Sequence, residues 1–215
     1  MEQAFRPAMR LQMALYPIFL KLEGRKVLIV GGGKIAEEKI YAVLRSATDV
    51  TVVAPEITVR IGSWVERGLV RHIAEEYRPG TAQEYFLVIA CTDSEAVNRK
   101  IYAEAQRAGV LCNAVDDPGH CDFYAPAVVH RGEFQIAIST GGNSPALAQR
   151  VRQKLELDYG PEYESWTGWL GRMREGIIKA LPRSQRRTEL LHLLAATVQQ
   201  KTQELQPRNH ADERE

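Results

Sequence analysis

The chain has 215 residues, of which 45% are apolar and 26% are charged, and its formal net charge is +1. This length suits one domain with an appendage or two small domains. The small net charge argues against nucleic acid or an acidic membrane as a partner, and no apolar run approaches the roughly 20 residues of a transmembrane helix. Residues 1–13 lack the apolar core of a signal peptide and are interpreted as an N-terminal extension.

The first half of the chain alternates apolar strands with amphipathic helices. The run 26–30 (KVLIV) leads into three glycines and is apolar after its lysine, as is typical of a strand buried on both faces of a parallel sheet. Ser94 is a candidate N-cap, and Gly109 is a candidate helix stop. We predict strands over 26–30, 50–53, 70–73, 86–91 and 110–115, and helices over 34–46, 57–67 and 94–108. This order predicts an α/β fold with a doubly wound, Rossmann-type parallel sheet over 14–117.

The second half follows a different pattern. Apolar runs over 127–130 and 134–138 flank Arg131-Gly132 and predict two strands joined by a tight turn. Ser144 and Pro145 predict the start of a helix that reaches 155. We predict further helices over 159–205, broken at Gly160-Pro161 and Leu181-Pro182. The domain prediction is an α+β segment over 118–145, a helical C-terminal domain over 146–206 and a disordered tail over 207–215.

The three cysteines, Cys91, Cys112 and Cys121, are an odd number and form no Cys-x-x-Cys pair. We therefore expect no disulfide framework, and the pattern favours a reducing cytoplasm. Cys121 follows His120, but two adjacent ligands do not make a metal site, so no resident metal is predicted.

Gly31, Gly33 and Ala36 fit the G-x-G-x-x-G/A pattern of dinucleotide-binding sites. Gly31 permits a tight turn, Gly33 lets the backbone approach a pyrophosphate, and Ala36 allows the helix to pack closely on the strand. The pattern follows a predicted strand and opens a predicted helix, whose N–H groups and dipole favour the negative pyrophosphate. We therefore predict a dinucleotide site; the alternative is a glycine turn without a ligand.

The residues after the second strand bear on the choice of nucleotide. Ala54-Pro55 replaces the acidic residue usual at this strand end, and Glu56 is close enough in sequence to reach the ribose hydroxyls. No arginine stands at the strand end to hold a 2′-phosphate, although Arg60 is near. The sequence therefore favours NAD over NADP.

Polar residues also follow the fourth and fifth strands. Ligands of open α/β sheets bind outside the carboxyl ends of the strands. We therefore predict Thr92 and Asp93 as cofactor contacts, Asn113 as a substrate contact and Asp116 as the catalytic carboxylate. The alternative is that Asp116 or Asp117 caps the turn before the next proline.

The segment 139–145 combines hydroxyl groups, two glycines and a helix start. Exposed N–H groups, side-chain donors and the positive end of a helix dipole make a cradle for an anion. The alternative is a simple capped loop. The predicted substrate-binding residues of this loop are Ser139, Thr140, Gly141, Gly142, Asn143 and Ser144.

Five stretches of the sequence together resemble one known family: 16–39, 52–56, 90–93, 112–116 and 139–145. In the same order, they are similar to motifs of the precorrin-2 dehydrogenase/sirohydrochlorin ferrochelatase family, the N-terminal part of sirohaem synthase. The resemblance covers about residues 15–157. The helical remainder resembles the family only in type.

This resemblance implies NAD-dependent oxidation of precorrin-2 to sirohydrochlorin in sirohaem biosynthesis. In some members it also implies a lyase activity, the insertion of Fe²⁺ as a substrate. It implies a homodimer in which the middle segment of each chain helps build the fold of the other. The family's catalytic aspartate falls on Asp116, and its nucleotide contacts fall on Lys34, Ile35 and the Pro55-Glu56 pair. Thr140 stands where relatives often have serine, and it keeps a hydroxyl group.

The implied chemistry suits these residues, because NAD⁺ takes a hydride from the reduced tetrapyrrole and Asp116 takes a proton. His120 and His130 are alternative bases or metal contacts. Candidate partners for the substrate's carboxylates are Arg131, Arg150 and Arg152. Two other interpretations stay open: an NAD-sensing regulatory module without catalysis, and a dehydrogenase for another anionic substrate.

Overall fold

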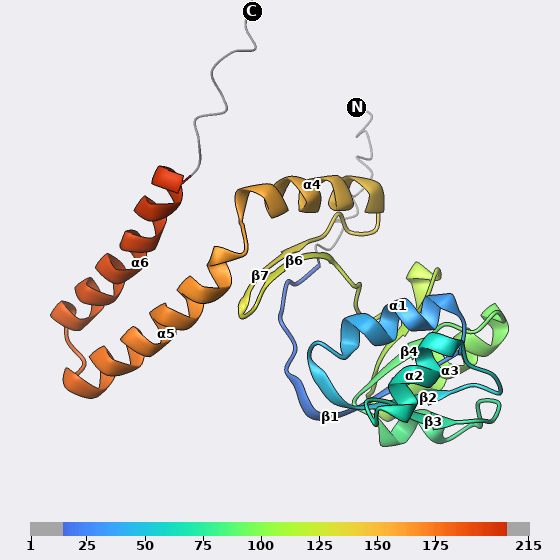
Figure 1. Cartoon of the computed structure of the whole chain (residues 1–215). Coiled ribbons are helices and arrows are strands. Elements are labelled where there is room, and N and C mark those ends of the chain that lie inside the picture. The colour runs from blue at the N-terminus through green and yellow to red at the C-terminus, as the bar shows by residue number, and fades with distance from the viewer. Residues whose placement is uncertain (1–14, 206–215) are drawn as a thin grey trace, which may run out of the picture. The chain divides into compact units, whose positions relative to one another are not determined.

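The computed structural model describes the backbone of residues 15–205 and the side chains of residues 15–196 (Figure 1). The extension predicted over 1–13 and the tail predicted over 207–215 lie outside the described residues. The chain divides between Ala125 and Pro126 into two compact units. The finer predicted boundaries, at 117 and 145, stay predictions.

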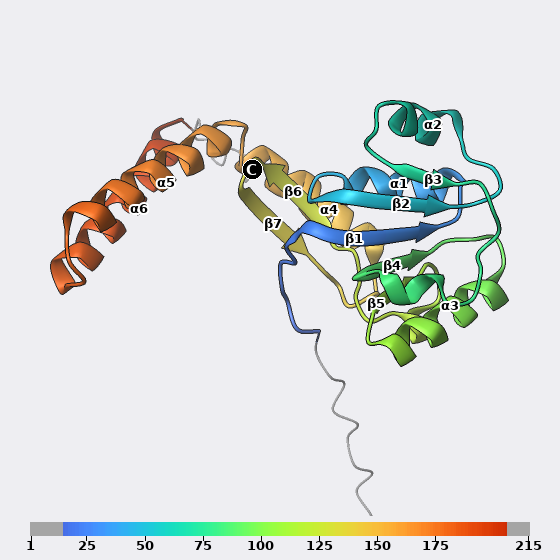
Figure 2. The same cartoon turned by 90° about the horizontal axis from the view of Figure 1, so that it is seen from below.

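The first unit is built on a sheet of five parallel strands in the order β3-β2-β1-β4-β5. The strands are β1 (Leu22–Val30), β2 (Ala47–Val53), β3 (Arg71–Ile73), β4 (Leu87–Ala90) and β5 (Leu111–Ala114). Between and after them lie α1 (Lys34–Val43), α2 (Val59–Glu66), α3 (Glu95–Ala108) and the short 3₁₀ helices η1 (Thr81–Glu84) and η2 (Pro118–His120). The arrows of β1, β2 and β4 point the same way in Figure 2, and the predicted α/β order is confirmed.

Alternate residues of the central strand β1 supply the two faces of this sheet. Val27 and Ile29 pack with apolar side chains of α1 and α2, whereas Leu28 and Val30 pack with those of α3. The run 27–30 is apolar throughout because helices cover both faces of the strand. Burial worth about 25 cal/mol per Å² of apolar surface therefore stabilises this strand on both of its faces.

The ends of these elements follow local signals where such signals exist. The Ser94 hydroxyl accepts the Val97 N–H, and Gly109 has a left-handed backbone, so both predicted boundaries of α3 are confirmed. β1, by contrast, begins at Leu22 rather than at 26. Gly24 has φ +67° and the pairing register with β2 shifts there, so this exposed stretch lacks the alternation that predicts a strand.

The loop after β5 folds back along the outer edge of that strand. The Asp122 N–H donates to the Cys112 carbonyl oxygen at 2.8 Å, and the Asp122 carboxylate accepts the Cys112 N–H at 2.8 Å. Asn113 forms a β-bridge with Cys121, and its side-chain amide donates to the Phe123 carbonyl oxygen. These contacts satisfy the backbone of an edge strand and anchor the loop that begins at residue 115.

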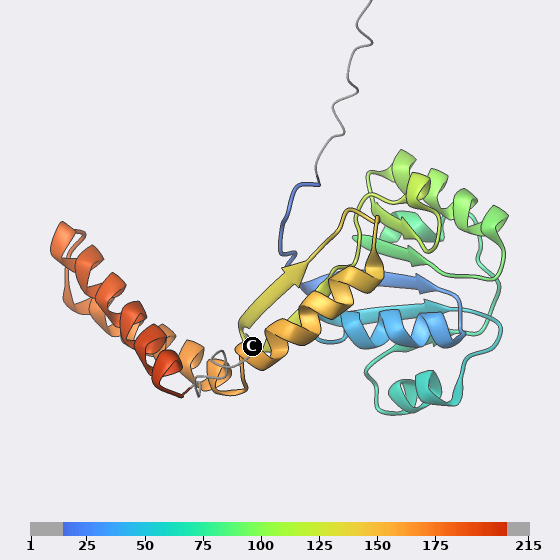
Figure 3. The same ribbon diagram turned by 90° about the horizontal axis from the view of Figure 1, so that it is seen from above.

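The second unit combines a β-hairpin with helices. Strands β6 (Ala127–Arg131) and β7 (Phe134–Ile138) are antiparallel, and α4 (Pro145–Asp158) lies against them (Figure 3). The helices α5 (Glu162–Ala180) and α6 (Gln185–Leu205) follow and pack on each other. The predicted breaks before α5 and α6 and the predicted N-cap Ser144 are confirmed. Within residues 15–205, no helix is both long and apolar enough to cross a membrane.

Candidate active site

The turn between β1 and α1 contains two glycines that admit no side chain. Gly31 has φ +127°, and a Cβ atom there would lie 2.5 Å from the carbonyl oxygen of Cys91. A Cβ atom on Gly32 would overlap the carbonyl oxygen of Glu56. The segment 56–58 lies this close because the Gly32 carbonyl oxygen accepts the Thr58 N–H at 3.0 Å. The turn predicted at Gly31 is present. The requirement at Gly32 is one that the G-x-G-x-x-G/A pattern does not specify.

The N-terminus of α1 faces open space. Gly33 is the N-cap residue without a side-chain cap, and a Cβ atom on it would meet no described atom within 4 Å. Lys34 and Ile35 are exposed, while Ala36 is fully buried against the sheet. A pyrophosphate is bound by backbone N–H groups without intrahelical partners, and the missing Cβ leaves room for its approach. This turn over 31–33, the phosphate turn, therefore fits the diphosphate of a dinucleotide.

The segment beyond β2 presents one carboxylate and one constrained guanidinium. Pro55 and Glu56 are exposed at the end of the strand. The guanidinium of Arg60 lies over two aromatic rings, 5.4 Å from the centroid of Tyr41 and 5.3 Å from that of Trp64. Tyr41 lies about two turns after the first residue of α1. Its contact with the Arg60 guanidinium therefore keeps that group away from the phosphate turn, which lies at the start of the helix.

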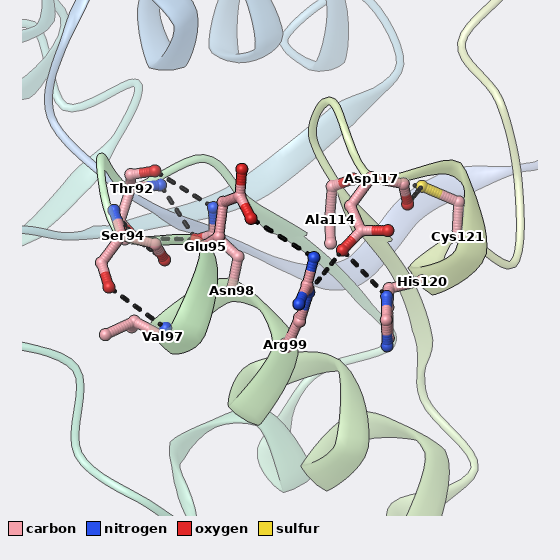
Figure 4. A network of polar contacts seen from close by, with 10 residues as sticks. All are labelled: Thr92, Ser94, Glu95, Val97, Asn98, Arg99, Ala114, Asp117, His120 and Cys121. Atoms are coloured by element: carbon pink, nitrogen blue, oxygen red, sulfur yellow. Dashed lines mark hydrogen bonds and ion pairs between the residues drawn. The ribbon is translucent and has the colours of Figure 1, made fainter.

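The loop after β4 is held by a single buried side chain. Asn98 is 5% exposed, and its Oδ1 accepts both the N–H and the hydroxyl of Thr92, at 3.1 and 2.8 Å. Its Nδ2 donates to the Thr92 carbonyl oxygen at 3.0 Å. Thr92 is thereby fixed at the strand end (Figure 4), and Asp93 is left exposed. No sequence motif identified Asn98, because its role depends on a loop six residues earlier.

β5 ends in a tight turn that carries Asp116. The Asp117 N–H donates to the Ala114 carbonyl oxygen at 3.2 Å, and Asp116 between them has φ +64° and an exposed side chain. The Nδ2 group of Asn113 donates instead to Cys121 and Phe123. A contact of Asn113 with substrate would therefore use its Oδ1 atom.

Asp117 forms an ion-pair network (Figure 4). Its Oδ2 atom lies 2.9 Å from Nδ1 of His120 and 2.8 Å from Nε of Arg99; the His120 contact is a close approach rather than an aligned hydrogen bond. His120 first, and then Arg99, lower the pKa of Asp117 below its ordinary value. Asp117 makes no side-chain cap to η2; its carboxylate contacts His120 and Arg99 instead.

The predicted anion-binding loop belongs to the second unit and is ordered by its own hydrogen bonds. The Asn143 side chain donates to the Thr140 carbonyl oxygen at 3.0 Å. Three hydroxyls accept backbone N–H groups: Ser139 from Gly141 at 3.2 Å, Thr140 from Ser144 at 3.1 Å, and Ser144 from Leu147 at 3.3 Å. A hydroxyl that accepts in this way keeps its own proton to donate. The loop is therefore capped, as the alternative interpretation expects, and retains the donors that an anion needs.

The candidate arginines of the second unit have different surroundings. Arg131 donates to the carbonyl oxygens of Tyr159 and Glu156, at 2.9 and 3.1 Å, and so satisfies the last carbonyls of α4. Arg152 pairs with the Glu156 carboxylate. The expectation that Arg131 and Arg152 bind substrate carboxylates is not supported. Arg150 is exposed and stays a candidate for that role.

The sheet brings the predicted residues of the first unit together. Because the strands are parallel neighbours in the order β2-β1-β4-β5, the phosphate turn, Glu56, Thr92-Asp93 and Asp116 all follow carboxyl ends along one edge. Among the side chains of residues 15–196, no three His, Cys, Asp or Glu side chains are grouped to hold a metal ion. The edge thus offers a nucleotide cradle, with the exposed carboxylate of Asp116 beyond it.

Alanine at Gly32 and at Gly33 should have opposite effects. Gly32→Ala drives a Cβ atom into the Glu56 carbonyl, so we expect the free energy of unfolding to fall by about 1–3 kcal/mol. Gly33→Ala enters open space and should leave that free energy nearly unchanged, while weakening NAD⁺ binding because the Cβ stands where a pyrophosphate approaches. Urea unfolding and NAD⁺ titration test both; unchanged affinity in Gly33→Ala would put the diphosphate elsewhere.

Comparison with known families agrees with the division of the chain into two units after Ala125. Residues 18–127 match a family model described as putative NAD(P)-binding, and residues 131–156 match the central domain of sirohaem biosynthesis proteins. Two relatives are siroheme synthase 2 of Yersinia enterocolitica, 42% identical over 144 residues, and siroheme synthase 1 of Aeromonas hydrophila, 35% identical over 170 residues. These alignments cover 67% and 79% of this chain but 30% and 36% of the relatives, so the chain spans about a third of their length.

A solved structure extends the likeness beyond the nucleotide domain. SirC, a precorrin-2 dehydrogenase, superposes with a TM-score of 0.69 at 28% sequence identity. The match covers 88% of this chain and 100% of SirC. The chain therefore belongs to the putative NAD(P)-binding family that matches residues 18–127, and over the greater part of its length it is similar to proteins of sirohaem biosynthesis.

Proposed function

We propose that this chain oxidises precorrin-2 to sirohydrochlorin with NAD⁺, on the route to sirohaem. One observation carries the proposal: the phosphate turn and the exposed Asp116 carboxylate follow strand ends at the same edge of one sheet. The full-length match to SirC, a precorrin-2 dehydrogenase, supports the choice of substrate.

Different residues of the site serve cofactor binding and proton removal. NAD⁺, when bound, supplies the hydride acceptor. Gly31, Gly33 and the first N–H groups of α1 hold the diphosphate, and Glu56 contacts the ribose. Asp116 takes the proton that the tetrapyrrole loses, so the substrate gives up one hydride and one proton in total. Thr92 and Asp93 bind the cofactor at the end of β4.

The polycarboxylate substrate needs donors as well as a base. We assign this role to the hydroxyls of Ser139, Thr140 and Ser144, whose protons are not used within the loop. The backbone N–H group of Gly142, the second side-chain N–H of Asn143 and Arg150 add donors of the same kind. The Gly141 N–H and the first side-chain N–H of Asn143 are already used within the loop.

Insertion of Fe²⁺ into sirohydrochlorin is a second activity that the same carboxylate could serve. Metal insertion removes the protons of pyrrole N–H groups, and Asp116 is exposed at the strand end to accept them. Fe²⁺ is then a substrate, and no resident metal is required.

We also propose that the chain works as a homodimer in the cytoplasm. Among the described residues of the second unit, the buried apolar ones are Ala127, Val129 and Ala148, while Leu147 and Leu157 of α4 are 53% and 84% exposed. A hairpin and helix that bury so little apolar surface are stabilised by a second copy. The three unpaired cysteines suit a reducing compartment.

The nucleotide preference follows from the segment after β2. Glu56 repels a 2′-phosphate, and Arg60 is stacked on two rings rather than free at the strand end. We expect NADP⁺ to bind at least about tenfold more weakly than NAD⁺, equivalent to about 1.4 kcal/mol. Titration of both nucleotides at fixed ionic strength measures this ratio, and equal or tighter binding of NADP⁺ would contradict the preference.

Replacing Asp116 tests the proposed base. Asp116→Asn removes the basicity but not the shape, and asparagine also tolerates the left-handed backbone of this position. We expect kcat for precorrin-2 oxidation to fall by about 10²–10⁴-fold, with NAD⁺ affinity and melting temperature nearly unchanged. Glu66→Gln, which changes an exposed carboxylate at the end of α2, serves as the matched control.

Two results would count against the proposal in different ways. Near-normal turnover of Asp116→Asn would remove Asp116 as the base and move attention to His120. A wild-type protein that binds NAD⁺ but forms no sirohydrochlorin would favour the NAD-sensing module.

A further inference from the structure

Asp116 has a backbone conformation that side-chain-bearing residues rarely adopt. Among residues 15–205 it is the one non-glycine residue with positive φ, at +64°. Such a conformation persists where the surroundings hold it. The question is which contacts hold this turn, because the direction of the Asp116 carboxylate depends on it.

The backbone of the turn is tied at both ends. The Asp117 N–H donates to the Ala114 carbonyl oxygen, and the His120 N–H donates to the Asp117 carbonyl oxygen at 2.9 Å. The Cys121 thiol lies 3.2 Å from the Ala114 carbonyl oxygen and 3.3 Å from that of Asp117. These contacts close the turn within its own loop (Figure 4).

The side chain of Asp117 ties the same turn to α3. Arg99 of that helix donates from Nε to Asp117 Oδ2 at 2.8 Å, and Nδ1 of His120 approaches the same atom at 2.9 Å. The His120 ring stands edge-on to Tyr102, also of α3, at a centroid distance of 5.1 Å. Two successive aspartates thus differ in surroundings: the Asp116 side chain is exposed, and that of Asp117 is 20% exposed and engaged.

We propose that Asp117 is a positioning residue: anchored by Arg99 and His120, it holds the turn that gives Asp116 its left-handed backbone and directs the Asp116 carboxylate to the substrate. This inference rests on the proposed function, in which Asp116 is the base. The side chains of His120 first, and then of Arg99, lower the pKa of Asp117, so its carboxylate is a weaker base than an ordinary aspartate. Its Oδ2 atom is also already engaged by both side chains, so Asp117 serves as an anchor and not as a proton acceptor.

Two variants remove the anchor from opposite sides. Asp117→Ala deletes the carboxylate, and Arg99→Met deletes the cation from an exposed position on α3 without touching the loop. Displacing a catalytic group by about 1 Å costs about 10²-fold in rate, so we expect kcat to fall about 10- to 10²-fold in both, with the KM for NAD⁺ nearly unchanged. The matched control is Glu95→Gln, which breaks the other ion pair of Arg99 and leaves Asp117 in place; its kcat should equal that of the wild type.

A double-mutant cycle with Asp116→Asn separates positioning from general damage. If Asp117 acts through Asp116, then adding Asp117→Ala to Asp116→Asn should lower kcat no further, because no base is left to misplace. A loss of rate of the same size in both backgrounds would overturn the inference, as would wild-type kcat in Asp117→Ala. Amide hydrogen exchange gives a readout that is independent of activity: the backbone N–H of residue 117 should exchange faster in Asp117→Ala and Arg99→Met but not in Glu95→Gln.

The outcomes distinguish this inference from the proposed function. If Asp116→Asn turns over normally, the base assignment fails and the positioning role fails with it. If Asp116→Asn is slow while Asp117→Ala and Arg99→Met are normal, the proposed function stands and only the positioning role of Asp117 is overturned.

Discussion

Gly31 and Gly32 let the end of β1 touch the ends of β2 and β4 with no side chain in between. A Cβ atom on the first would press on the Cys91 carbonyl, and one on the second would overlap the Glu56 carbonyl. This contact sets the spacing of three strand ends and, with it, the direction in which α1 begins. The open N-terminus at Gly33, the exposed Glu56 and the fixed Thr92 all take their places from it. Any group that widens the turn should therefore disturb each of them.

The parts of the site at the edge of the sheet are held by different kinds of contact. The phosphate turn and the Thr92 loop are anchored to central strands and to the buried side chain of Asn98. Asp116 stands beyond the edge strand β5, where no further strand supports it. The returning loop supplies the missing support, through Asp122 against the strand and Asp117 against α3. The Asp116 carboxylate, which we propose as the base, thus gains on an edge strand the fixed geometry that proton transfer requires.

Local signals in the sequence account for much of this arrangement. The apolar run 26–30, the glycines after it and the N-caps Ser94 and Ser144 depend on neighbouring residues, and the structure agrees with each. The pairing of Arg99 with Asp117 spans eighteen residues and exists because the sheet brings α3 beside the loop after β5. Arg131 is used at the end of α4 for a similar reason, since the hairpin and the helix pack together. No periodicity or motif encodes contacts of this kind.

The most direct test of the central claim, that this site moves a hydride from a reduced tetrapyrrole to NAD⁺, is a stoichiometric absorbance measurement. The protein is mixed anaerobically with precorrin-2 and NAD⁺, and NADH and sirohydrochlorin are followed together. We predict that they form in a one-to-one ratio and that omitting NAD⁺ stops both. Sirohydrochlorin that forms at the same rate without NAD⁺, or no sirohydrochlorin from a protein that binds NAD⁺ normally, would contradict the claim.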